Sequence, residues 1–135
     1  MNTGSDERDT EQCRALRRSL LELHRTLIDQ ERRMYETLHG AQSAGAFLQF
    51  VAFSEQMRWL EPLSRVIVML DEALDGDEAA PAAQVVAARI RDLLRLDRAS
   101  SDPFSTRYIA HFDNSPELAG AHAQVLMLLK AFPAK

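Results

Sequence analysis

The chain has 135 residues, of which 46% are hydrophobic and 27% are charged, and its formal net charge is −4. This length suits a single domain that buries a core without cross-links, and the composition is ordinary for a soluble globular protein. A negative net charge provides no attraction toward nucleic acid or anionic lipid, so we expect neither nucleic acid nor membrane as a partner.

Targeting and redox signals favour a cytoplasmic protein. The first residues, Met1 to Glu7, are polar and acidic, unlike a secretory signal. The longest unbroken apolar run, Val66 to Leu70, is far shorter than the roughly 20 residues of a membrane-spanning helix. The single Cys13 cannot form an intrachain disulfide, so nothing indicates an oxidising compartment.

Helical periodicity begins near the N-terminus. We expect a helix over about residues 8–39, with a disordered tail over residues 1–10 and a single domain over residues 11–133. Gly40 follows directly, as is typical of the residue just past a helix end. The oppositely charged pairs Asp29/Arg33 and Arg32/Glu36 are four residues apart, a spacing that modestly stabilises a helix. The apolar stripe of this helix comprises Cys13, Leu16, Leu20, Leu23, Leu27, Met34 and Leu38.

The middle of the chain predicts two more helices. A short helix over residues 44–53, capped by Ser43, precedes a helix over about residues 55–74. Because Pro62 has no backbone N–H, we expect a kink or a restart of the second helix there. After this helix, Asp75-Gly76-Asp77 predicts a turn. The inner stripe of the second helix consists of Trp59, Leu63, Ile67, Leu70 and Leu74.

The C-terminal part of the chain predicts three further helices. Pro81 stands early in a helix to about Leu96, because a missing N–H costs nothing in the first turn. After a polar link, Asp102-Pro103 caps a short helix, and Ser115-Pro116-Glu117 begins the last one. No segment alternates apolar and polar residues for long enough to predict a strand. The predicted fold class is therefore all-α, an irregular four- or five-helix bundle.

Two polar residues interrupt the apolar stripes. Glu31 lies beside the stripe of the first helix, and His122 lies within the stripe of the last. A carboxylate removed from water needs a partner, since its desolvation costs several kcal/mol. We expect Glu31 to be buried against a His, Tyr or Arg, with His122 as the favoured partner and with His24, Tyr35, Arg65 and Arg107 as the other candidates.

Two interpretations of these polar residues stay open. In the first, His24, Glu31, Tyr35 and His122 line a small ligand-binding pocket inside the bundle. In the second, they form a structural buried pair that sets the register of the helices.

The helix over residues 55–74 carries apolar residues on more than its inner face. Val68 and Met69 point away from its inner stripe. A helix that is apolar on more than one side must be covered on more than one side. We therefore expect Val68 and Met69 to lie at an interface, either in a homodimer or against another protein partner.

Signatures of metal binding and catalysis are weak. Glu36 and His39 have the Glu-x-x-His spacing of carboxylate-bridged di-iron bundles, but those bundles need the motif on two helices. Ala73 and Ala82 stand where a calcium loop needs oxygen ligands. Cys13 lies on an inner stripe, which is typical of a buried thiol rather than a nucleophile. We expect no metal, no cofactor and no catalytic residue.

Two segments carry a resemblance to a known family. They are Glu31-Arg32-Arg33-Met34-Tyr35-Glu36 with His39-Gly40, and Trp59-Leu60-Glu61-Pro62-Leu63-Ser64 with Ile67-Val68 and Asp71-Glu72. This pattern resembles a family of small, uncharacterised bacterial helical proteins over most of residues 16–130. Ser54-Glu55 stands where that family has Asp-Pro, so the start of the following helix can differ. The resemblance implies an all-helical single domain and supplies no activity, ligand or catalytic residue.

Two functions from different classes follow from these patterns. The first is a non-enzymatic helical module that self-associates or docks a partner, as the surplus apolar residues Val68 and Met69 indicate. The second is a small-molecule or metal-binding bundle, with enzymatic activity as one option, built around Glu31 and His122.

Overall fold

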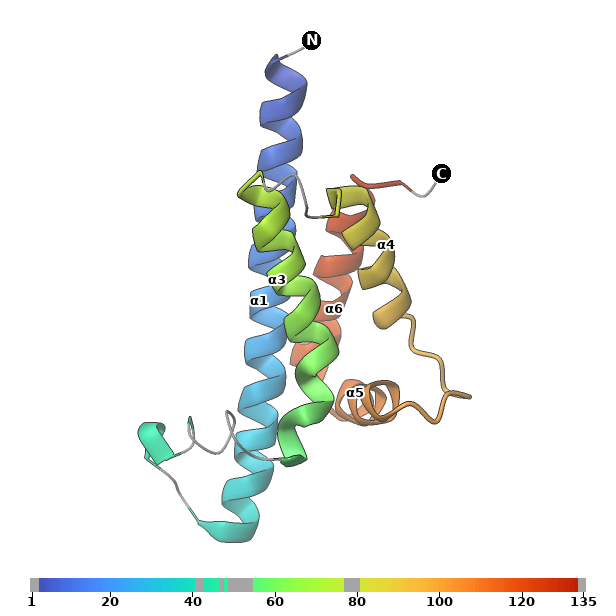
Figure 1. The fold of residues 1–135 in the computed structure, drawn as a ribbon. Coiled ribbons are helices and arrows are strands. Elements are labelled where there is room, and N and C mark those ends of the chain that lie inside the picture. The colour runs from blue at the N-terminus through green and yellow to red at the C-terminus, as the bar shows by residue number, and fades with distance from the viewer. Residues whose placement is uncertain (1–2, 41–42, 47, 49–54, 77–80, 134–135) are drawn as a thin grey trace.

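The computed structural model describes residues 3–40, 43–46, 48, 55–76 and 81–133 (Figure 1). Within these ranges the chain contains no strand, so the fold is all-α, as the sequence predicts. None of the helices described there is long and apolar enough to cross a membrane. The elements are α1 (Thr3–His39), the 3₁₀ helix η1 (Glu55–Leu60), α3 (Glu61–Leu74), α4 (Ala83–Leu93), α5 (Pro103–Asn114) and α6 (Pro116–Leu129).

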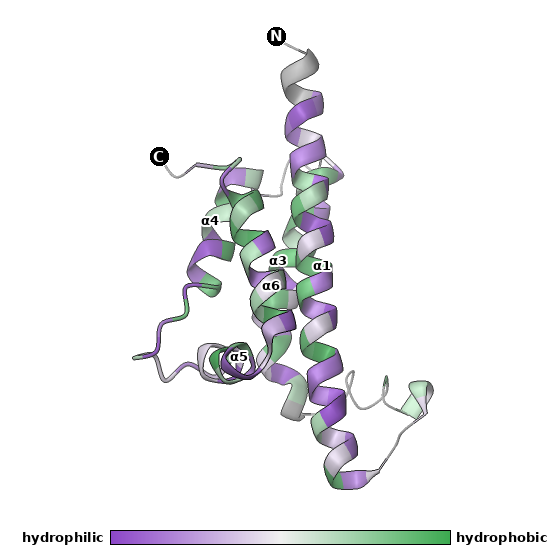
Figure 2. Cartoon of the chain, turned by 180° about the vertical axis from the view of Figure 1, so that it is seen from behind, coloured by the Kyte–Doolittle hydropathy of each residue, from purple (hydrophilic) through white to green (hydrophobic). Residues whose placement is uncertain are grey.

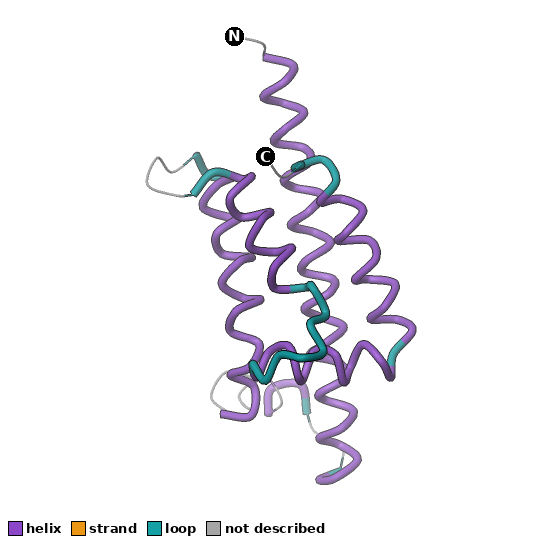
Figure 3. Tube along the Cα trace, turned by 90° about the vertical axis from the view of Figure 1, so that its right-hand side faces the viewer, coloured by secondary structure: helices purple, strands orange, loops and turns teal. Residues whose placement is uncertain are grey.

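Helix α1 is the long central helix of the bundle, and both α3 and α6 pack along it (Figure 1). Helix α4 packs against α3 and α6. Helix α5 lies across the other helices instead of running along them, as Figure 3 shows. This crossing places the side chains of α5 over one end of the bundle, where they reach both α1 and η1.

The core forms where α1, α3 and α6 meet. Leu20 and Leu27 of α1, Leu70 of α3 and Val125 of α6 are all fully buried in one cluster. The burial of each such side chain stabilises the folded state by about 1.5–3 kcal/mol. The first turns of α1 project beyond the other helices and are mainly hydrophilic (Figure 2).

The apolar stripe predicted for α1 is right at its centre and wrong at its C-terminal end. Met34 and Leu38 are 47% and 79% exposed, because this end of α1 extends past the helices that cover its middle (Figure 1). At its other end α1 begins at Thr3. The helix therefore runs through most of the segment for which the sequence predicts a tail.

Local signals account for most of the other helix ends. Helix α3 begins at Glu61 with Pro62 in its first turn, which confirms the predicted restart. The carboxylate of Asp102 accepts a hydrogen bond from the Ser105 N–H at 3.2 Å, and the Ser115 hydroxyl accepts one from the Leu118 N–H at 3.1 Å. Such caps stabilise a helix by about 0.5–2 kcal/mol.

Helix α4 is shorter than predicted. Its N-cap is Ala82, in an extended conformation, so Pro81 precedes the helix instead of lying inside it. At the other end α4 stops at Leu93, and Leu96 has a φ of 59°, which is incompatible with a right-handed helix.

The short helix predicted over residues 44–53 is described in part. Residues 44–46 are helical, and the Ser43 hydroxyl accepts a hydrogen bond from the Ala46 N–H at 3.1 Å, as expected of a cap. Residues 47 and 49–53 of this prediction lie outside the described residues.

Candidate functional site

A buried ion cluster joins α1 to α5. The Glu31 residue is only 5% exposed. Its carboxylate accepts hydrogen bonds from His111 Nε2 at 2.8 Å and from Arg107 Nε and Nη2 at 3.0 and 3.2 Å. These partners lie 76 and 80 residues away along the chain, so the cluster ties the crossing helix to α1.

The cluster keeps the Glu31 carboxylate ionised. Burial alone would raise its pKa, but the hydrogen bonds and charges of His111 and Arg107 outweigh burial and lower the pKa from 4.5 to about 2. An ionised carboxylate with its oxygens engaged in charged hydrogen bonds is suited to holding α5 in place. It is poorly suited to donating a proton at neutral pH.

Glu31 is buried, as the sequence predicts, but the prediction that His122 is its partner is wrong. His122 Nδ1 lies 2.7 Å from the Tyr108 hydroxyl, and its ring contacts Phe112 edge-on with centroids 5.1 Å apart. Burial lowers the pKa of His122 and raises that of Tyr108, so both side chains stay neutral. Helical periodicity places His122 on the inner face of α6, but it does not show which neighbouring side chain this face meets.

Sequence reasoning named Arg107 among the candidates and missed His111. The two residues are four apart, so both project from one face of α5. A pair of basic side chains at this spacing beside the aromatic positions Phe104 and Tyr108 was a signal for a buried carboxylate partner.

The other residues of the predicted pocket have separate partners. His24 Nε2 lies 3.2 Å from the Ser64 hydroxyl, at the contact between α1 and α3. The Tyr35 ring lies 4.5 Å from the His39 ring, near the end of α1. The hydrogen bonds of His24, Glu31 and His122 thus go to three different places, and these residues do not converge on one ligand.

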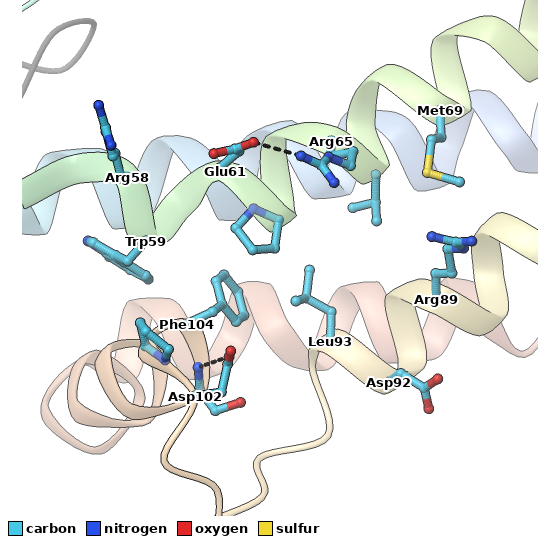
Figure 4. A pocket seen from close by; sticks show the side chains of 14 residues that line it. Arg58, Trp59, Glu61, Arg65, Met69, Arg89, Asp92, Leu93, Asp102 and Phe104 are labelled. Atoms are coloured by element: carbon cyan, nitrogen blue, oxygen red, sulfur yellow. Dashed lines mark hydrogen bonds and ion pairs between the residues drawn. The ribbon is translucent and has the colours of Figure 1, made fainter. Parts of the chain in front are cut away.

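An open cleft of about 670 Å³ lies between α3, α4 and the start of α5 (Figure 4). One side is built by η1 and α3, and the residues of that side follow the three-to-four-residue spacing of a single helix face. Phe104 and Leu93 face them from α5 and α4 (Figure 4). The apolar side chains on the α3 side are Trp59, Pro62, Val66 and Met69.

Charges of both signs surround this cleft. Glu61 and Arg65 neutralise each other through a 2.6 Å ion pair, and Asp102 caps α5. On α4, Arg89 and Asp92 make no ion pair with any described residue. Figure 4 shows Arg89 opposite Met69, across the cleft. The α4 rim therefore offers one uncompensated charge of each sign.

Trp59 connects the cleft to the Glu31 cluster. Its ring centroid lies 5.7 Å from that of Phe104, which lines the cleft, and 5.7 Å from that of His111, which belongs to the cluster. The indole N–H is buried and has no hydrogen-bond partner in the part of the chain that the structure describes. Trp59 is also the sole tryptophan of the chain, so its fluorescence reports on this region alone.

The two predicted interface residues face different surfaces. Met69 is partly buried and lines the cleft, whereas Val68 is 51% exposed and does not line it. Only Met69 therefore belongs to a concave surface with other apolar side chains.

The residues considered for metal or thiol chemistry have other contacts. No group of three or more His, Cys, Asp or Glu side chains is placed to hold a metal ion within the described ranges. Glu36 instead bonds Arg32 at 2.7 Å. Cys13 is buried, and burial raises the pKa of its thiol, which disfavours the reactive thiolate.

Comparison with known proteins finds no matching family model, no similar curated protein and no matching solved structure. The function is therefore inferred from the geometry and chemistry of this chain.

Proposed function

We propose that the protein is a cytoplasmic, non-enzymatic binding module, and that the cleft between α3, α4 and α5 docks an amphipathic helix of a partner protein. The carrying observation is the row of apolar side chains along one side of the cleft, from Trp59 through Pro62 and Val66 to Met69. At a rise of about 1.5 Å per residue this side is about 15 Å long. An amphipathic helix presents an apolar stripe with the same three-to-four-residue spacing.

The charges at the rim support a polypeptide as the occupant. Arg89 and Asp92 have opposite signs and both lack an ion-pair partner among the described residues. A nucleic acid or an anionic lipid surface would bring negative charge against Asp92 and Glu61. The polar face of a helix carries charges of both signs and can satisfy Arg89 and Asp92 together.

The types of apolar residue in the cleft also support docking. Tryptophan is enriched among the residues that dominate binding energy at protein interfaces. The thioether of methionine adapts its shape to a partner surface. Trp59 and Met69 stand at the two ends of the apolar side, so both ends of a docked helix meet such a residue.

The partner helix can be identified by site-specific photo-crosslinking in the native host. A photoreactive phenylalanine analogue replaces Met69, and the same analogue at Val85 is the matched control, because Val85 is 49% exposed on α4 outside the cleft. We expect a crosslinked peptide with an amphipathic helical pattern from position 69 and not from position 85. Crosslinks at equal yield from both positions would contradict the proposal.

A crosslink alone does not establish that the partner helix docks in the cleft. The crosslinked peptide is therefore synthesised and titrated into the purified protein. Trp59 is already 9% exposed, so we expect its emission to change in intensity, and to saturate, as the docked helix alters the contacts of the ring. Reversing the rim charges with Arg89→Glu and Asp92→Lys should weaken binding, whereas Arg14→Glu on α1 should not. Unchanged Trp59 emission at saturating peptide would contradict the assignment of the cleft.

A homodimer is a second candidate, favoured by the outer face of α6. Gly120 in the helix interior costs about 0.5–1 kcal/mol relative to alanine, yet a Cβ there would meet nothing within 4 Å. The monomer thus gives no packing reason for this glycine, whereas close approach by a second copy would give one. Between Glu117 and Lys130 this exposed face carries no charge and comprises Gly120, Ala123, Gln124, Leu126 and Met127.

A further inference from the structure

A groove of about 570 Å³ lies between α1, α5 and the start of α6, beside the Glu31 cluster and apart from the docking cleft. Volumes of this order are typical of sites for small molecules. Met34 and Ala110 give the groove an apolar side. Its polar lining includes Gln30, Arg33, Arg107 and Glu117.

Gln30 contributes a hydrogen-bond donor that the described chain does not use. The residue is only 9% exposed, and its side-chain nitrogen, Nε2, is buried with no hydrogen-bond partner among the described residues. Buried polar groups nearly always have a partner, so an orphaned amide in the wall of a groove points to a ligand acceptor.

Two arginines add positive charge and further donors. Arg33, for which the sequence predicts a pair with Asp29, has no side-chain hydrogen bond or ion pair within the described ranges. Arg107 uses Nε and Nη2 to hold Glu31, which leaves Nη1 available, and its side chain is 45% exposed. The groove therefore combines three nitrogen donors from two helices.

We infer that this groove binds a small organic monocarboxylate. Arg33, Arg107 and the Gln30 amide bind the carboxylate, and the apolar body of the ligand lies against Met34 and Ala110. Glu31 already balances Arg107, whereas Arg33 makes no ion pair with any described residue and so supplies positive charge for the ligand. The Glu117 carboxylate opposes a second negative charge, which favours a monoanion over a phosphate dianion.

The test uses sodium hexanoate as the probe and side-chain ¹⁵N–¹H NMR as the readout. We expect the Gln30 amide resonances to shift and saturate at millimolar hexanoate. Arg33→Gln should weaken binding by about tenfold, since one charged hydrogen bond is lost. Arg14→Gln, on an exposed part of α1 outside the groove, is the matched control and should bind hexanoate like the unaltered chain. Backbone spectra of both variants report whether each remains folded.

Three results would overturn the inference. The first is that the Gln30 amide resonances do not shift at tens of millimolar hexanoate. The second is equal hexanoate binding by Arg33→Gln and Arg14→Gln. The third is tighter binding of inorganic phosphate than of hexanoate, which would contradict the monocarboxylate class.

Discussion

His111 on α5 donates a 2.8 Å hydrogen bond to Glu31 on α1, and the same imidazole ring stacks on Trp59 with an interplanar angle of 21°. One side chain thus links a buried charge to the aromatic side of the cleft between α3, α4 and α5. Arg107, one turn earlier on α5, engages both oxygens of the same carboxylate. The position of α5 across the bundle therefore depends on a charged contact as well as on apolar packing.

Removing the Glu31 carboxylate should destabilise the fold. Glu31→Ala leaves the buried His111 without its acceptor, and we expect the free energy of unfolding to fall by about 1–3 kcal/mol. Glu31→Gln should cost less, because its amide oxygen still accepts a hydrogen bond. Both changes in the free energy of unfolding are measured by urea denaturation, with circular dichroism as the signal.

The matched control is Glu22→Ala on the same helix. Glu22 pairs with Arg25 at the surface, where both side chains are more than half exposed, and such pairs contribute about 0–1 kcal/mol. Equal losses for Glu31→Ala and Glu22→Ala would show that the buried cluster contributes no more than a surface pair.

The Glu31 cluster should also make stability depend on pH. The carboxyl pKa is about 2 in the folded protein and near 4.5 in the unfolded chain. A depressed folded pKa stabilises the protein above the unfolded pKa, and this contribution is lost as the pH falls from about 4.5 toward 2. The stability difference between the unaltered chain and Glu31→Gln should therefore shrink across this window. A difference that stays constant on acidification would contradict the assigned ionisation.

The Tyr108–His122 hydrogen bond should couple α5 to α6. Its donor and acceptor lie 2.7 Å apart in the core. A double-mutant cycle with Tyr108→Phe and His122→Leu isolates this contact, and we expect a coupling of about 0.5–1.5 kcal/mol. Additive losses in the cycle would mean that the two side chains act only through their apolar surfaces.

The helices could be predicted where the signals are local. Pro62, Asp102 and Ser115 mark three helix starts, and each acts within one turn of its own position. The ends of α1 and α4 were less predictable. The exposure of Leu38 depends on where the covering helices end, and the end of α4 involves the backbone turn at Leu96.

The site was only partly predictable for a related reason. Periodicity shows that Glu31 faces inward, which the structure confirms, but the identity of its partner depends on how α5 crosses α1. That crossing brings His111 to Glu31 and leaves His122 with Tyr108. The cleft depends on three helices at once, so of the two interface residues predicted from the sequence, Val68 and Met69, Met69 lines the cleft and Val68 does not.

The proposed homodimer makes a prediction about solution mass. Light scattering should give about twice the 15.2 kDa monomer mass, because pairing two copies of α6 covers its uncharged outer face. Met127→Glu should shift the protein toward the monomer, since residue 127 is 60% exposed in the single chain and a charge there costs little before association. Val68→Glu is the matched control, with residue 68 at 51% exposure on α3, and it should leave the dimer intact. If Val68→Glu alone dissociates the dimer, the interface lies on α3 instead. A monomeric unaltered chain at high micromolar concentration would contradict self-association through either face.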